Sequence, residues 1–399
     1  MKKYLLYLVL FAVLLIFGNG CTTEVETEVE VEKQGYWNHF LLSTPYYNFI
    51  TNGIVVDDKL IISCYSRTLV FDDLKTEPSS FGGSSVIGYT FKPALSKELN
   101  ATKSIMNLRQ IAFRRHTEGG HSYTVINPEQ FGEQFKNFRF KQVFHYRCEI
   151  GAFNSKNRFV SVLAEWDFLI GDEYNERIVY VDISPKGSQT CGIAISDFGI
   201  LEIPSMPRWR KNTMQFSNIV SYNDKFYIAF RGINAGIGFG PDDPDMGIPY
   251  GGWHYLEISE DGNMREFINH LPEHIFTFFV WRGYLFAMLY HGQLIYTEDG
   301  ENWTWTNFKI EGLIYTFRDI DGYLFLHNCD LIYFVEAIDG DLHNLKLYKV
   351  PTDNIKDYPI SSINKFKDDL VITTDRGIFY KSFTKVINDT KKLKTNQGE

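Results

Sequence analysis

One short phrase recurs along this sequence: an apolar stretch, a tight polar turn, and a second apolar stretch. The turns contain Asn-Asp, Arg-Gly or Asp-Gly steps, which suit the positive φ angles of short hairpin turns. β-branched and aromatic residues dominate the stretches on either side, as in strands. The phrase therefore predicts a repeated β-hairpin, seen at Ile54–Ile62, Ile219–Ile228, Phe279–Phe286, Phe317–Phe325 and Ile363–Ile372.

The spacing of these hairpins predicts how they are arranged. The later copies begin their second strand at Leu285, Leu324 and Leu370, at intervals of 39 and 46 residues. A second hairpin follows within each interval, so one interval holds four strands, as one blade of a β-propeller does. The sequence therefore predicts an all-β fold, a β-propeller of seven four-stranded blades, over residues 35–385. Six or eight blades, and a β-sandwich with a smaller propeller-like unit, are the alternatives.

The two ends of this domain receive separate predictions. In many propellers, a strand from one terminus completes the blade formed by the other terminus. Residues 36–42 have the aromatic and apolar character of such a strand. The lysine-rich segment 386–399 is predicted to be a disordered tail.

One turn resembles a known structural motif. Residues Thr297 to Trp303 read TEDGENW, which resembles the Asp-box, S/T-x-D-G-x-x-W, of sialidases and other BNR-repeat propellers. The resemblance implies a structural turn between strands in which Asp299 accepts backbone N–H bonds and Gly300 supplies the unusual φ. Trp303 is expected to pack back over the hairpin. A partial copy, Ser259–Asn263, lacks the tryptophan.

The first twenty residues predict export. Lys2 and Lys3 precede an apolar run from residue 4 to residue 17, which is too short to span a bilayer but suits a signal peptide. Gly18-Asn-Gly-Cys21 follows and resembles the lipobox of bacterial lipoproteins, although Gly18 stands where that family favours leucine. The resemblance implies cleavage of a signal peptide at residues 1–20 and lipidation of Cys21. A secretory peptide with an unrelated cysteine is the alternative.

The segment after Cys21 has the composition of a tether. Residues 22–34 contain five glutamates and no aromatic residue, which predicts an extended, solvated linker over residues 21–34. Thr22 is not the aspartate that retains some lipoproteins at the inner membrane. Acidic residues after the cysteine also resemble surface-export signals of Bacteroides-type lipoproteins. We expect a protein anchored by lipid in the bacterial cell envelope, at the outer membrane or the cell surface.

Charge and cysteine content exclude some functions. A formal net charge of −9 argues against a nucleic-acid partner, because phosphates need a basic surface. No CxxC pair is present, so zinc and redox motifs are unsupported. Buried thiols are favoured over disulfides, although the sequence leaves the state open for Cys64, Cys148, Cys191 and Cys329.

A glycine- and aspartate-rich insertion between residues 231 and 254 is the main candidate for ligand binding, because long loops in compact folds are often functional. Arg231, Trp253 and His254 would contribute a cation and an aromatic platform for a glycan or a peptide. No cofactor is required; Ca²⁺ is the one candidate, because aspartate oxygens are ligands that it prefers. A solvated acidic turn is the favoured alternative for Asp242, Asp243 and Asp245.

Catalysis has weaker support than binding. A sialidase needs an arginine triad, a Tyr/Glu nucleophile pair and an aspartic acid, and the R-I-P motif that usually places its first arginine is absent. Paired carboxylates for glycoside hydrolysis could come from residues 165–167 and 172–173. We therefore expect a propeller that binds a glycan or an envelope protein, with no catalytic residue assigned. A sialidase-like glycoside hydrolase with carboxylates at the propeller mouth, and a structural component of an envelope complex, are the alternatives.

Overall fold

A computed structural model describes most of the chain from residue 36 onward. The described ranges are 36–40, 50–56, 58–64, 67–82, 86–92, 99–104, 111–117, 120–141, 151–167, 172–185, 193–202, 214–232, 254–268, 270–310, 316–328, 330–355, 358–375 and 377–396. The predicted signal peptide and linker, with Cys21, lie outside these ranges.

The strands within these ranges form seven antiparallel sheets, which we name A to G. Five of them are meanders of four consecutive strands. Sheet B contains β2 (Ile50–Val56), β3 (Lys59–Cys64), β4 (Arg67–Phe71) and β5 (Ser79–Gly82). Sheet C contains β6 (Val86–Lys92), β7 (Leu99–Ser104), β8 (Ile111–Thr117) and β9 (Gly120–Ile126). Sheet E contains β15 (Met214–Tyr222), β16 (Lys225–Gly232), β17 (His254–Ile258) and β18 (Met264–Ile268). Sheet F contains β19 (Ile275–Trp281), β20 (Tyr284–Leu289), β21 (Gln293–Thr297) and β22 (Thr304–Lys309). Sheet G contains β23 (Thr316–Ile320), β24 (Tyr323–His327), β25 (Ile332–Ala337) and β26 (Leu345–Lys349), with the 3₁₀ turn η6 (Ile338–Gly340) before β26.

Sheet A joins the two ends of the domain. It contains β27 (Ile360–Phe366), β28 (Asp369–Thr374), β29 (Gly377–Ser382) and, at its outer edge, β1 (Asn38–Phe40). β1 pairs antiparallel with β29, with His39 opposite Phe379. Their rings stack at 4.2 Å between centroids. A strand from residues 36–42 therefore pairs with the last strand, as predicted.

Sheet D differs from the other sheets in its first strand. The 3₁₀ turns η2 (Pro128–Phe131) and η3 (Glu133–Phe135) lead into β10 (Phe138–Phe140), which is followed by β11 (Gly151–Phe153), β12 (Arg158–Asp167), β13 (Asp172–Pro185) and β14 (Ile193–Leu201). β10 and β11 pair side by side along the same edge of β12, at residues 163–165 and 159–161. The first strand position is thus divided between two short strands, which makes this sheet five-stranded.

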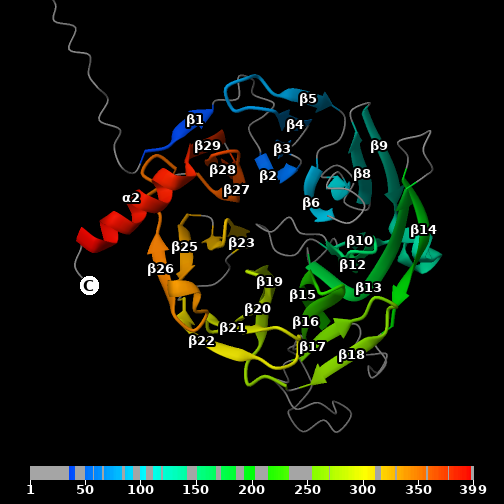
Figure 1. Cartoon of the computed structure of the whole chain (residues 1–399). Helices are drawn as coiled ribbons and strands as arrows, with labels where there is room; N and C mark the ends of the chain where they lie inside the picture. The colour runs from blue at the N-terminus through cyan, green and yellow to red at the C-terminus, as the bar shows by residue number, and fades with distance from the viewer. Residues whose placement is uncertain are drawn as a thin grey trace, which may run out of the picture. The chain divides into compact units, whose positions relative to one another are not determined.

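The sheets form a closed ring (Figure 1). The first strands of neighbouring sheets contact one another from sheet A through sheets B to G and back to sheet A, with β11 serving as the first strand in sheet D. The all-β, β-propeller prediction is confirmed, with six four-stranded blades. The prediction that every blade has four strands is wrong for sheet D, because its first strand is interrupted.

The first hairpin in three of these sheets shows why the recurring phrase folds as it does. A two-residue turn of type I′ needs positive φ at both central residues, and its twist matches that of the flanking strands. The φ angles are 49° and 61° at Asn223 and Asp224, 51° and 79° at Arg282 and Gly283, and 50° and 78° at Asp321 and Gly322.

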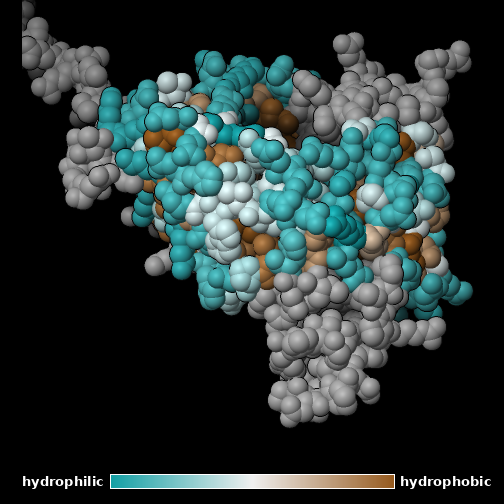
Figure 2. Space-filling view, turned by 60° about the horizontal axis from the view of Figure 1, so that its bottom comes forward, coloured by the Kyte–Doolittle hydropathy of each residue, from teal (hydrophilic) through white to brown (hydrophobic). Residues whose placement is uncertain are grey.

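The hydrophobic core lies between neighbouring sheets. Tyr227 and Tyr255 of sheet E pack with Phe278 of sheet F, and Trp281 of sheet F packs with Leu324 of sheet G. All five side chains are buried. The outer surface is mostly hydrophilic on the face in Figure 2, where hydrophobic residues form small separate groups.

One of the cysteines in the propeller domain, Cys64, lies within the described residues. Cys64 at the end of β3 is a buried free thiol, and burial raises its pKa to about 12. This agrees with the preference for buried thiols at this position. Cys148, Cys191 and Cys329 lie outside the described residues.

The C-terminal segment corrects a prediction. Instead of a disordered tail from residue 386, the chain forms α2 (Phe383–Asn396) directly after β29. Phe383, Val386 and Ile387 are buried in the core shared by sheets A and G. Lys391 on the exposed side pairs with Glu336 of β25 at 2.6 Å. Within the part of the chain that the structure describes, no helix is long and apolar enough to span a membrane.

If α2 is part of the folded domain, truncating its buried face should destabilise the whole ring. Ile387→Ala is expected to lower the free energy of unfolding by about 2–4 kcal/mol, because it removes buried methylene groups and leaves a cavity. The matched control is Asn388→Ala at an exposed position of the same helix, which should change stability by less than ~0.5 kcal/mol. Denaturant unfolding followed by tryptophan fluorescence would measure both, and equal effects would contradict the packed helix.

Candidate functional site

The candidate site is an open cavity of about 510 Å³ at the axis of the ring. Its walls come from β11, β15, β19 and β23, the first strands of four consecutive sheets, and from the hairpin turns that follow β11 and β15. It presents hydroxyl, amide, carboxylate and aliphatic groups. Those used below belong to Ser155, Asn218, Ser221, Asn223, Asp224, Thr277, Val280 and Thr316.

A buried amide fixes two of these walls to each other. Asn218 of β15 accepts a hydrogen bond from the Phe278 N–H at 3.0 Å and donates one to the Phe278 carbonyl at 2.7 Å. The Thr277 hydroxyl donates to the Asn218 Oδ1 at 3.0 Å. Asn218 and Thr277 are buried. A buried polar atom without a hydrogen-bond partner costs desolvation free energy, and these hydrogen bonds avoid that cost. We call this pairing of one side-chain amide with both main-chain groups of one residue a carboxamide clamp.

Sequence reasoning missed Asn218. The signal was available, because aligning the hairpin phrases places Thr277, Thr316 and Ser362 at the same position of later copies. A polar residue in each copy of an otherwise apolar strand marks a position near the axis. From the sequence alone, however, a polar residue at that position looks the same as an ordinary exposed residue, because its place beside the axis depends on the closed ring.

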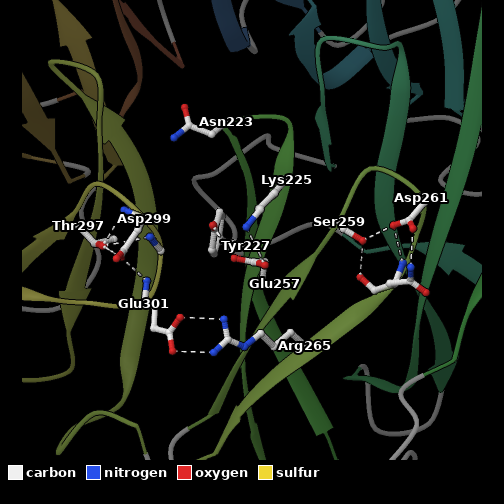
Figure 3. Close-up of polar contacts among 12 residues, drawn as sticks. Asn223, Lys225, Tyr227, Glu257, Ser259, Asp261, Arg265, Thr297, Asp299 and Glu301 are labelled. Carbon is white, nitrogen blue, oxygen red and sulfur yellow. Dashed lines mark hydrogen bonds and ion pairs between the residues drawn. The ribbon is translucent and has the colours of Figure 1, made fainter.

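The Thr297–Trp303 turn joins β21 to β22 (Figure 3). Asp299 Oδ1 accepts the main-chain N–H groups of Glu301 and Asn302 at 2.8 and 2.7 Å. The Asn302 side-chain amide donates to the other oxygen at 2.7 Å. These donors, led by the Asn302 side chain, hold the pKa of Asp299 well below its usual range. Thr297 Oγ1 accepts the Gly300 N–H at 3.0 Å, and Gly300 has a φ of 82°.

This turn also joins sheet F to sheet E. The Tyr255 hydroxyl donates to the Gly300 carbonyl at 3.0 Å and accepts the Trp303 indole N–H at 3.1 Å. The Tyr222 hydroxyl donates to the Glu298 carbonyl at 3.0 Å. Trp303 therefore packs against the neighbouring sheet as well as its own hairpin.

The partial copy makes the same kind of junction one sheet earlier. In Ser259–Asn263, between β17 and β18, the Ser259 hydroxyl donates to Asp261 and to the Asn263 carbonyl. Arg158 of sheet D donates to the Glu260 carbonyl at 2.7 Å. Glu260 stands where Glu298 stands in the full copy, so both turns offer the same main-chain acceptor to the preceding sheet. The motif's described contacts here are structural.

A tyrosine and a glutamate meet between these two turns (Figure 3). The Tyr227 hydroxyl donates to Glu257 Oε2 at 2.9 Å, and Lys225 pairs with Oε1 at 3.0 Å. Burial, together with the Glu257 charge, raises the pKa of Tyr227 far above its usual value. A nucleophile activated by an adjacent base also needs access to substrate. Tyr227 is buried and does not belong to the described lining of the axial cavity, so we assign this pair a structural role.

The predicted ligand residues are only partly placed. Arg231 lies near the end of β16 opposite Gln215, and His254 begins β17 opposite Phe230 and Ile268. Only their backbone positions are described. Trp253 and the aspartates of the insertion, Asp242, Asp243 and Asp245, lie outside the described residues. Among the residues that the structure describes, no cluster of His, Cys, Asp or Glu could hold a metal ion.

The carboxylate candidates of sheet D fall on paired strands. Asp167 at the end of β12 lies opposite Asp172 at the start of β13, and Trp166 lies opposite Glu173. Residues 165–167 and 172–173 thus occupy neighbouring register positions, as two arms of one hairpin. None of them lines the axial cavity among its described lining residues.

Comparison with known proteins supports the fold. No protein-family model and no curated protein matches the chain. Among solved structures, the β-propeller domain of Cps50 (Swd1) from Myceliophteria thermophila has a TM-score of 0.51 at 10% identity, covering 86% of this chain and 99% of that one. Virginiamycin B lyase from Staphylococcus aureus has a TM-score of 0.49 at 12% identity, covering 86% and 98%. YCF48 from Cyanidioschyzon merolae has 0.48 at 10% identity, covering 87% and 98%. At this identity, the likeness to the Cps50 domain shows the β-propeller fold alone.

The junction made by the Thr297–Trp303 turn can be tested at Gly300. A Cβ there would lie 2.1 Å from the Tyr227 hydroxyl, in addition to the cost of φ at 82°. Gly300→Ala is expected to lower the free energy of unfolding by about 3–5 kcal/mol, as backbone strain plus forced displacement of a buried ring. The matched control is Gly283→Ala, where φ is 79° and no atom lies within 4 Å, and it should cost about 1 kcal/mol. Equal losses in thermal or denaturant unfolding would show that Tyr227 does not press against this turn.

Proposed function

We propose that this chain is a lipid-anchored protein of the bacterial cell envelope, at the outer membrane or the cell surface. Its propeller binds a glycan or a protein, without catalysis. The observation that carries the binding role is the axial cavity. At about 510 Å³ it has the size of a small-molecule or side-chain site, and it opens to solvent between the first strands of four sheets.

The chemistry of the cavity supports recognition of an uncharged ligand. Ser155, Ser221 and Thr316 supply hydroxyl groups and Asn223 an amide. Val280, with 37% of its surface exposed, supplies an apolar contact. These groups can exchange hydrogen bonds with ligand or water at little cost.

Binding fits the carboxylate content of the cavity better than hydrolysis does. Glycoside hydrolysis uses two carboxyl groups about 5–10 Å apart on either side of the scissile bond. Among the described lining residues, Asp224 carries the one carboxylate, and its Oδ1 accepts the Ser155 main-chain N–H at 2.9 Å. The hydrolase alternative would have to draw on residues such as Asp167 and Asp172.

The membrane anchor rests on the sequence. Lys2, Lys3 and a short apolar run precede the small residues before Cys21, and an acidic segment follows. A lipid on Cys21 would hold the domain at a membrane surface, where a binding site needs no membrane-spanning helix.

The anchor is tested by Cys21→Ser. This change removes the thiol that carries the lipid, so the variant should lose label from a radioactive or clickable fatty acid and move to the soluble fraction. Cys64→Ser, at a buried position within the propeller, is the control and should keep its label. Fatty-acid labelling of Cys21→Ser equal to that of the wild type would contradict the lipoprotein proposal.

The binding role is tested by filling the cavity. Val280→Trp should weaken binding to any hit from a glycan array or an envelope-protein screen by at least about tenfold, because the indole occupies ligand space. Lys309→Trp, at an exposed position of the outer strand β22, adds the same bulk outside the cavity and should bind normally. Aryl-glycoside turnover that is lost in Asp167→Asn would overturn the binding role in favour of a hydrolase.

A further inference from the structure

Among the described strands, the first strand of a sheet has one edge that pairs with no other strand. β15, β19 and β23 each stand at the end of their sheet, and the axial cavity lies beside them. Main-chain N–H and C=O groups on such an edge need partners other than a strand. Which residues turn these groups toward the axis follows from the hairpin register.

Two-residue hairpins fix that register. Trp281 and Tyr284 flank the turn in sheet F and form a hydrogen-bonded pair, so pairs alternate from there. Phe278, three residues earlier, is in a non-hydrogen-bonded pair with Ala287, and its N–H and C=O point away from β20. In sheet G the same count from Ile320 places Phe317 in the equivalent position, opposite Leu326.

The chain satisfies the Phe278 groups itself. They are held by the carboxamide clamp from Asn218 of the preceding sheet, at 3.0 and 2.7 Å. The same clamp occurs where β1 begins. There, Asn354 accepts the Trp37 N–H at 3.0 Å and donates to its carbonyl at 2.8 Å. Among the described residues, a primary carboxamide thus covers both main-chain groups of one residue in two places, and in a third the Asn364 amide donates to the Gly53 carbonyl at 2.9 Å.

The Phe317 groups receive no such clamp within the described residues. The residue equivalent to Asn218 in the preceding sheet is Thr277. Its hydroxyl is directed to Asn218 and, at 3.3 Å, to the Phe278 carbonyl. A threonine also lacks the paired donor and acceptor that both groups would need. Thr316 and Phe317 line the axial cavity, so a ligand there can reach these groups.

We infer that the axial cavity binds a peptide segment that presents an asparagine or glutamine carboxamide to the main chain of Phe317. This deepens the proposed binding function and rests on it. The N–H and C=O of one residue on a strand edge point in the same direction. A ligand that binds both must present an acceptor to the N–H and a donor to the C=O from the same side. A primary carboxamide offers that pair, as does one residue of an extended peptide.

A glycan matches this edge less well. The acetamido group of an amino sugar is a trans secondary amide, so its N–H and C=O point in opposite directions. It can bond one of the two Phe317 groups but not both. Two neighbouring sugar hydroxyls can supply a donor and an acceptor, but both rotate freely, whereas a primary carboxamide holds the two groups in one plane. The geometry therefore favours a peptide over a glycan.

The first test uses the wild-type propeller and hydrogen exchange at single-residue resolution. Without ligand, the Phe278 amide should exchange at least about tenfold more slowly than the Phe317 amide, because only Phe278 donates to a clamp. Equal exchange rates would overturn the inference, since they would mean that Phe317 is already covered.

The second test uses acetylated tripeptides with N-methylamide ends and a central Asn or Gln, compared with the same peptides carrying Asp or Glu. A carboxylate cannot donate to the Phe317 carbonyl, so the acidic peptides should bind at least about tenfold more weakly. Binding of the Asn peptide should slow exchange at Phe317. A central Ala that binds as well as Asn would assign the contact to the peptide backbone and overturn the side-chain assignment.

The third test closes the site from within. Thr277→Asn places a carboxamide where Asn218 stands one sheet earlier, so it should protect the Phe317 amide and abolish peptide binding. Thr304→Asn, the same substitution on the outer strand β22 away from the cavity, should keep peptide binding, and melting curves would check that both variants fold. If Thr277→Asn binds the peptide normally, the inference is wrong. If no peptide binds while Val280→Trp abolishes glycan binding, the inference fails and the proposed binding function stands; if nothing binds the cavity, both fail.

Discussion

Sheets E, F and G each carry apolar side chains on both faces, and a neighbouring sheet covers each face. A single four-stranded sheet with two apolar faces would expose a large area to water, and burial of that area is the main favourable term in folding. Trp281 and Tyr255 show the consequence, since each is buried only because the neighbouring sheet is present. The ring must therefore close, and sheet A is where it does so. β1, α2 and the clamp on Trp37 all act at or beside that closure.

The sequence predicts best those features that depend on a few adjacent residues. The hairpin turns at Asn223, Arg282 and Asp321 were recognised because positive φ restricts which residues can stand there. The blade arrangement followed from their spacing, and the closing strand from its position and apolar character. α2 was missed although Phe383, Val386 and Ile387 have helical spacing, because lysines and threonines surround them and the segment is helical only where it packs on sheets A and G. The divided first strand of sheet D depends on pairing along β12, which no local pattern shows.

The candidate site was harder to predict for a different reason. Its walls combine main-chain edges, small polar side chains and apolar residues of the first strands, and none of these has a distinctive sequence pattern. Asn218 has a decisive position only when the ring brings β15 beside β19. The residues that attracted attention in the sequence, such as Asp299 and Trp303, have the most specific pattern but are engaged in holding sheet F to sheet E. The most specific sequence motif in this chain therefore forms a junction between two sheets, whereas the cavity is lined by residues that match no motif.

The two turns between third and fourth strands share one detail that bears on how such a chain can evolve. Arg158 donates to the Glu260 carbonyl in one junction, and Tyr222 donates to the Glu298 carbonyl in the next. The acceptor is main chain in both, so it survives any substitution at positions 260 and 298. The donor is a guanidinium in one case and a phenol in the other. It too can be replaced by another side chain that carries a donor and is long enough to reach the carbonyl. Contacts of this kind let neighbouring blades drift independently in sequence while the angle between them is preserved.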